Sequence, residues 1–167
     1  KAVHASADEN KDLHFALVDA SFSDKKNEPV TIENGRPLLF NTSEAAFLAG
    51  YVAAGMTKTG KVATFGGIQI PAVTVFMDGF ADGVAAYNDA KGASVQLLGW
   101  DKAAQAGSFT QSFDDQALGK QQAQQFISQG ADIIMPVAGP VGLGAATAAL
   151  ADGNTLIIGV DSDWYEA

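Results

Sequence analysis

Short apolar runs alternate with longer amphipathic segments through most of this chain. Short apolar runs are typical of strands buried on both faces of a parallel sheet, and helical spacing marks the longer segments. In chain order we expect a strand at 61–65, a helix at 73–86, a strand at 94–98, a helix at 116–129, a strand at 133–137, a helix at 142–151 and a strand at 155–160. Because crossovers of this length connect parallel strands, the pattern predicts a doubly wound α/β lobe over residues 60–160.

The preceding residues carry fewer elements. Strands are predicted at 14–18 and 38–40, with a tight turn at 34–35 between them. In the helix that follows, Gly50 lies among other small residues, which predicts very close packing against a sheet. These elements are too few for an independent sheet core, so residues 1–59 are expected to be part of another lobe.

Composition excludes several classes of function. Ten Lys and Arg against nineteen Asp and Glu give a net charge of −9, which disfavours nucleic acid as a partner because phosphate binding needs clustered cations. Without cysteine, the chain has no disulfide, zinc–thiolate site or cysteine nucleophile. No apolar run approaches the roughly 18 residues that cross a bilayer. Because Lys1 is not a natural start residue, we expect a processed or trimmed product.

Candidate ligand groups follow the predicted strands, since ligands of open α/β sheets bind beyond the carboxyl ends of the strands. The segments concerned start with Gly66-Gly67, GWDKAAQAGSFTQSFDD, AGPVGLG and DSDW, and their glycines offer backbone N–H groups. Phe109 offers a flat face to an aromatic ligand, although a core position is equally open. Asp161 can accept paired hydrogen bonds from a sugar or base. Asp19 is either a ligand acid or the cap of a turn.

Catalytic chemistry finds no support in the sequence. His4 has no orienting partner nearby and is expected at the surface, and His14 at an edge or partly buried position. No nucleophile–base pair, acid–base pair or metal cluster is apparent, so no catalytic or metal-ligating residue is assigned. We therefore expect a binding protein without a cofactor.

Five segments together resemble one family in order and spacing. They are GKVATFGG, PAVTVFMDGFADG, GSFTQSFDD, QGADIIMPVAGPVGLG and IIGVDSDW. They resemble the basic membrane protein family of substrate-binding lipoproteins, the purine-nucleoside-receptor type of ABC importer component. In addition, FNTSEAAFLAGYVAAG resembles the family's helix before the hinge, and HFALVDA its preceding strand. The resemblance covers nearly the whole chain.

The resemblance implies a periplasmic-binding-protein type I-like fold, in which two α/β lobes close on a nucleoside. Because family members are longer, it implies part of the first lobe over residues 1–59, the second lobe over 60–160 and the start of the return crossover to the first lobe over 161–167. It further implies an extracytoplasmic lipoprotein that is anchored to the membrane and delivers its ligand to a permease and an ATPase.

The resemblance also assigns roles to four residues. Phe109 matches the aromatic that stacks on the base, Asp161 the acid that binds the ribose hydroxyls, and Gly139 the glycine whose backbone lines the pocket. Asp19 matches, less closely, the first-lobe acid that reads the base edge. The family usually has glutamine where this chain has Trp164, so no role for Trp164 is implied.

The function expected from residues and resemblance together is that of a non-catalytic importer component that binds a nucleoside, with a purine nucleoside preferred. Two alternatives remain open: the ligand-sensing domain of a transcription regulator or signalling receptor, and a nucleoside-processing enzyme.

Overall fold

The computed structural model describes residues 2–26 and 28–165. The chain divides into two compact units, Lys1–Asn41 and Thr42–Ala167. The boundary therefore precedes helix α2 (Thr42–Met56), whereas the sequence pattern and the family resemblance put that helix with the first lobe. The reason for the difference is packing, because α2 lies against helix α3 of the second unit.

The first unit contains a helix and a two-stranded parallel sheet. The elements are α1 (Ala2–Glu9), β1 (Phe15–Val18) and β2 (Gly35–Leu38). In the register of the two strands, Phe15 lies opposite Gly35 and Val18 opposite Leu38. Alternate residues of β1 are exposed, so the expectation of a strand buried on both faces is wrong for β1 within this unit.

Strand β2 begins earlier than predicted. Leu39 and Phe40 follow the strand, and their exposed fractions are 62% and 66%. Asn34, predicted in a tight turn, is buried just before the strand. Its side-chain NH2 group lies 3.0 Å from three carbonyl oxygens, those of Ala7, Asn10 and Leu13, and shares its two N–H donors among them. Asn34 therefore ties the end of α1 to the start of β2.

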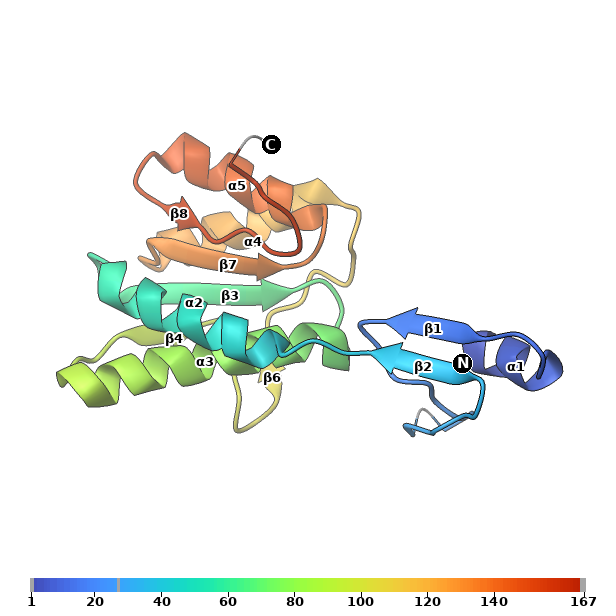
Figure 1. Cartoon of the computed structure of the whole chain (residues 1–167). Coiled ribbons are helices and arrows are strands. Elements are labelled where there is room, and N and C mark those ends of the chain that lie inside the picture. The colour runs from blue at the N-terminus through green and yellow to red at the C-terminus, as the bar shows by residue number, and fades with distance from the viewer. Residues whose placement is uncertain (1, 27, 166–167) are drawn as a thin grey trace. The chain divides into compact units, whose positions relative to one another are not determined.

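The second unit is built on a four-stranded parallel sheet with the order β4-β3-β7-β8. The strands are β3 (Lys61–Gly66), β4 (Gln96–Leu98), β7 (Ile133–Val137) and β8 (Leu156–Ile157), with a small hairpin of β5 (Trp100–Asp101) and β6 (Ala106–Gly107) after β4. The helices are α2, α3 (Pro71–Lys91), α4 (Gln116–Ser128) and α5 (Val141–Asp152). Helices α2 and α3 cover one face and α4 and α5 the other (Figure 1). The doubly wound parallel sheet is confirmed.

Helix α3 extends beyond the predicted range of 73–86 because both of its ends are marked. Pro71 occupies the first turn, where its missing N–H costs nothing. Gly92 ends the helix in the left-handed conformation with φ 63°, and its N–H donates to the carbonyl oxygen of Asn88.

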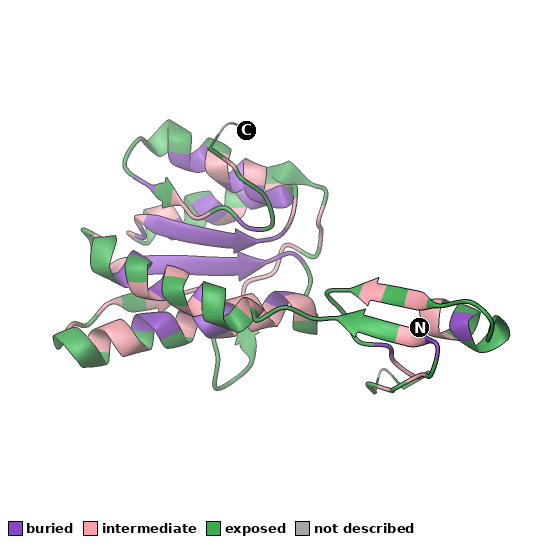
Figure 2. Ribbon diagram, viewed as in Figure 1, coloured by how far each residue is buried: buried purple, intermediate pink, exposed green. Residues whose placement is uncertain are grey.

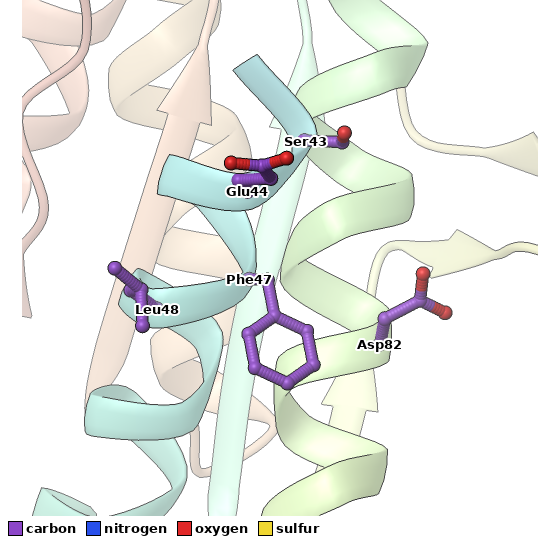
Figure 3. Close-up of a pocket in the computed structure, with 5 residues that line it drawn as sticks. All are labelled: Ser43, Glu44, Phe47, Leu48 and Asp82. Atoms are coloured by element: carbon purple, nitrogen blue, oxygen red, sulfur yellow. The ribbon is translucent and has the colours of Figure 1, made fainter. Parts of the chain in front are cut away.

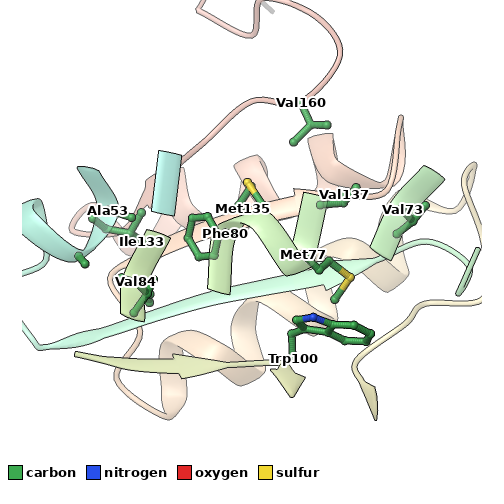
Figure 4. Packing of buried hydrophobic residues seen from close by; sticks show 12 residues of the cluster. Ala53, Val73, Met77, Phe80, Val84, Trp100, Ile133, Met135, Val137 and Val160 are labelled. Carbon is green, nitrogen blue, oxygen red and sulfur yellow. The ribbon is translucent and has the colours of Figure 1, made fainter. Parts of the chain in front are cut away.

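The two central strands are buried on both faces, as Figure 2 shows. Side chains alternate between faces along a strand. Val62, Ile133 and Met135 accordingly belong to the cluster under α2 and α3 (Figure 4), while Phe65 and Ile134 belong to the cluster under α4 and α5. The continuous apolar runs of the sequence follow from this arrangement.

Helices α2 and α3 approach each other through glycines. A methyl group on Gly50 would overlap the carbonyl oxygen of Phe80, and one on Gly83 would overlap that of Phe47. The predicted close packing at Gly50 is thus present, but the partner is a helix and not a sheet. In residues 2–26 and 28–165, no helix has the length and apolar character needed to cross a membrane.

Candidate ligand site at the carboxyl ends of the strands

Parallel pairing brings the carboxyl ends of β3, β4, β7 and β8 to one edge of the sheet. The segments that leave this edge are residues 66–70, 99–115, 138–140 and 158–165, and we call them together the rim. Three of the four predicted site residues, Phe109, Gly139 and Asp161, lie on the rim. Asp19 belongs to the first unit.

Gly66 and Gly67 tie the rim together through their backbone. The N–H of Gly66 donates to the carbonyl oxygen of Ser108 at 3.0 Å, and the N–H of Gly67 donates to the carbonyl oxygen of Val137 at 3.0 Å. Their carbonyl oxygens accept from the N–H groups of Thr110 and Gln111 at 3.0 and 2.8 Å. Both glycine N–H groups therefore have protein acceptors and are not available to a ligand.

The absence of side chains at Gly66 and Gly67 makes room for two phenyl rings. A methyl carbon on Gly66 would lie 2.6 Å from Cε1 of Phe109, and one on Gly67 would overlap the ring of Phe113. Real side chains do not approach each other this closely. The glycine pair is therefore a seat for the aromatic rings of residues 108–115.

Phe109 packs toward the interior of the second unit. Its ring meets the ring of Trp100 edge-on, with centroids 5.9 Å apart and an interplanar angle of 89°, a favourable aromatic geometry. Trp100 is 6% exposed, and its indole N–H donates to Oδ1 of Asp78 at 2.9 Å. Phe109 is partly buried against the same core cluster, so at least part of its surface serves packing.

Phe113 is a rim aromatic that the sequence reading did not single out. It is partly buried, and its Cδ1 lies 3.9 Å from the position that a Cβ would take on Gly139. Gly139 has φ 52°, a left-handed conformation that suits glycine. The repeated Ser-Phe pair in GSFTQSFDD is the signal that could have identified Phe113.

Asp19 and Asp161 share an uncommon backbone conformation. Each is exposed and follows a strand, and their φ angles are 58° and 68°. Non-glycine residues rarely adopt positive φ, and such positions cluster at functional sites. The N–H of Asp19 donates to the carbonyl oxygen of Leu38 at 2.8 Å, which fixes the turn after β1.

The two histidines lie in the first unit. Nδ1 of His4 is 2.9 Å from the carbonyl oxygen of Ser23, and Nε2 is 3.4 Å from Asp8 Oδ2. His4 is thus a partly buried packing residue, not the free surface histidine expected. His14, expected at an edge or a partly buried position, is exposed directly before β1. Within residues 2–26 and 28–165, no three His, Asp or Glu side chains group as a metal ion would require.

A hollow of about 410 Å³ lies between α2 and α3 (Figure 3). It is lined by Ser43, Glu44, Phe47, Leu48 and Asp82. Asp82 forms an exposed ion pair with Lys102 at 2.6 Å. None of the four predicted site residues lines this hollow.

Comparisons with known proteins agree on one family. The family model for Bmp, the PnrA-like ABC transporter substrate-binding proteins, matches residues 1–167. Basic membrane protein A of Borreliella afzelii is 35% identical over 157 residues, which are 93% of this chain and 43% of that protein. The ABC transporter nucleoside-binding protein BmpA of Lactococcus lactis is 32% identical over 97% of this chain and 43% of its own length.

Solved structures agree with this assignment. A solute-binding protein of an ABC transporter system from Aeropyrum pernix K1 superposes with a TM-score of 0.78 and 30% identity, over 94% of this chain and 42% of that chain. A transcriptional activator of the comK gene from Bacillus halodurans has a TM-score of 0.66 at 19% identity, which shows a shared fold alone. The fold is periplasmic-binding-protein type I-like, as expected, and the family description names substrate binding rather than catalysis.

The chain spans less than half the length of these relatives. From the match over residues 1–167, it belongs to the Bmp family of PnrA-like ABC transporter substrate-binding proteins.

Proposed function

We propose that this protein is the solute-binding component of an ABC importer and that its ligand is a nucleoside, with a purine nucleoside preferred. Family membership supports the importer role. The name of the Lactococcus relative, a nucleoside-binding protein, supports the ligand class. The single observation that carries the proposal is the convergence of aromatic, glycine and acidic residues on the rim.

Each rim residue has a role that suits its chemistry. The ring of Phe109 or of Phe113 stacks on the base. Of the two, Phe113 is the better candidate because it adjoins Gly139. The backbone at Gly139 lines the pocket at close range. Asp161, which is exposed, accepts hydrogen bonds from the two ribose hydroxyls. Asp19 in the first unit is proposed, on the family resemblance, to read the edge of the base.

The proposed partners follow from the importer role. The loaded protein delivers its nucleoside to a permease whose transport is driven by an ATPase, outside the cytoplasm, and a lipid anchor holds the full-length protein at the membrane. Binding needs no cofactor or metal ion, because every proposed contact is a hydrogen bond or a stacking contact.

Isothermal titration with adenosine, guanosine and inosine tests the ligand class. We expect saturable heat with at least one of them, and a smaller or absent response to free ribose, which lacks the stacking base. No heat with any of the three nucleosides would refute the proposal. Chromatography of the ligand after long incubation separates binding from turnover, and we expect the nucleoside to be recovered unchanged.

A further inference from the structure

We propose that Trp164 is a positioning residue that holds the Asp161 carboxylate in place by docking residues 160–165 onto helix α5. The proposal rests on the proposed function, because it assigns Asp161 to the ligand. Its structural basis is a set of contacts that connect two neighbouring segments of the rim.

The indole of Trp164 spans two glycines. The base of the side chain lies over Gly159, where an added Cβ would come 3.1 Å from Cγ of Trp164. The far end of the ring reaches Gly142 in the first turn of α5, where an added Cβ would overlap Cη2 and lie 3.2 Å from Cζ2 and Cζ3. At both positions the three nearest atoms all belong to Trp164, so these glycines make a fitted seat for this one side chain.

Local hydrogen bonds order the same segment. The indole N–H of Trp164 donates to Oγ of Ser162 at 3.0 Å, and the N–H of Tyr165 donates to Oδ1 of Asp163 at 2.9 Å. Before them, Val160 is buried in the core cluster. Asp161 is therefore held between a buried residue on one side and a docked indole three positions later on the other.

The seat also connects Asp161 to the segment that carries Gly139. The N–H of Gly142 donates to the carbonyl oxygen of Gly139 at 2.9 Å. An indole docked on Gly142 thus fixes the distance between the acid proposed for the ribose and the glycine proposed for the pocket lining. The backbone of the exposed Asp161 has φ 68°, which is unfavourable for a residue with a Cβ. This conformation therefore needs support from neighbouring residues. Pre-organisation of this kind lowers the entropic cost of binding.

One substitution tests the docking without ligand. Gly142→Ala adds a methyl group that overlaps the indole of Trp164 and should displace it. The substitution should not weaken the helix itself, because alanine is intrinsically better than glycine in a helix. Acrylamide quenching of tryptophan fluorescence reports the result, because Trp100 is only 6% exposed and the other tryptophan is Trp164. We expect stronger quenching and a red-shifted emission in Gly142→Ala than in the unmodified protein. Unchanged quenching and emission would overturn the docking.

The affinity ratio between adenosine and 2′-deoxyadenosine then tests positioning. The unmodified protein should prefer adenosine by about tenfold or more, the size of a hydrogen bond to a charged group. Asp161→Asn, Trp164→Ala and Gly142→Ala should each lose most of that preference, and Gly142→Ala should add nothing further in the Trp164→Ala protein. Tyr165→Ala is the matched control, because Tyr165 is 93% exposed, and it should keep the preference.

The outcomes separate the two proposals. If the unmodified protein binds no nucleoside, the proposed function fails and the quenching measurement alone decides whether Trp164 is docked. If Gly142→Ala and Trp164→Ala are folded by circular dichroism and keep the adenosine preference that Asp161→Asn loses, Trp164 only stabilises the segment and the positioning role is refuted.

Discussion

Replacing Phe109 with alanine separates a packing role from a ligand-stacking role. The ring contacts the edge of Trp100, lies against the bare backbone of Gly66 and packs on the core cluster that contains Val73. Full removal of a core phenylalanine costs about 3 to 5 kcal/mol, so for this partly buried ring we expect a loss of about 2 to 3 kcal/mol in the free energy of unfolding. For a unit of this size the midpoint of thermal unfolding should fall by about 6 to 15 °C.

Phe113→Ala is the matched variant, since it removes a second partly buried ring from the same segment. Here we expect the larger effect in binding, a loss of about 1 to 3 kcal/mol in nucleoside affinity, with a smaller change in stability. Thermal unfolding followed by circular dichroism and isothermal titration on both variants give the four numbers needed. If Phe109→Ala melts like the unmodified protein but binds nucleoside ten to a hundred times more weakly, a range of about 1.4 to 2.7 kcal/mol, the packing argument is wrong and Phe109 is the stacking residue.

Three further predictions concern binding, packing and pH. Asp161→Asn should weaken the binding of nucleosides more than the binding of free bases in parallel titrations, because only the nucleoside carries ribose hydroxyls. Equal losses of affinity would contradict the assignment of Asp161 to the ribose. Gly83→Ala should lower the free energy of unfolding by about 1 to 3 kcal/mol in denaturant titrations, since its methyl group overlaps the carbonyl oxygen of Phe47 and outweighs the helix gain; a stabilised variant would contradict the close approach of α2 and α3. Burial alone raises the pKa of Asp132. Hydrogen bonds from Thr57 Oγ1 and from the N–H groups of Lys58 and Thr59 outweigh burial and hold this pKa below its usual value. The stabilisation from Asp132 should therefore be complete above about pH 4, the unfolded value, and be lost as the pH falls through the lower folded pKa; an Asp132→Asn protein whose melting temperature falls as steeply with acid would refute this.

The hydrophobic pattern predicts the two central strands of the second unit well because these strands are buried on both faces, whereas the outer strands, predicted at 94–98 and 155–160, are shorter. The run at 133–137 is the strand observed, and the run at 61–65 is one residue short. The pattern fails at 38–40, where the apolar residues lie after the strand and are exposed, because strand position there depends on the pairing of Gly35 with Phe15. Pairing between distant segments leaves no local signal.

The candidate site is predictable only in part. The strand-end rule identifies the segments of Gly139 and Asp161, since it depends on sheet topology. The same rule cannot distinguish Phe109 from Phe113, because their surroundings depend on which ring packs against Gly66 and which against Gly67. Nor can it show that the N–H groups of Gly66 and Gly67 are already bonded, or that Gly142 seats Trp164.

The pairing of β3 with β7 has a consequence for how the chain acquires its structure. Val62 pairs with Ile133, so two adjacent strands at the centre of the sheet are 71 positions apart along the chain. The entropy of closing that long loop must be lost before the pairing gives any stabilisation, which makes folding slow. During synthesis the edge of β3 that pairs with β7 stays unpaired until β7 has left the ribosome. An edge of a strand that lies inside the sheet of the finished protein is therefore open to wrong pairing while the protein is being made.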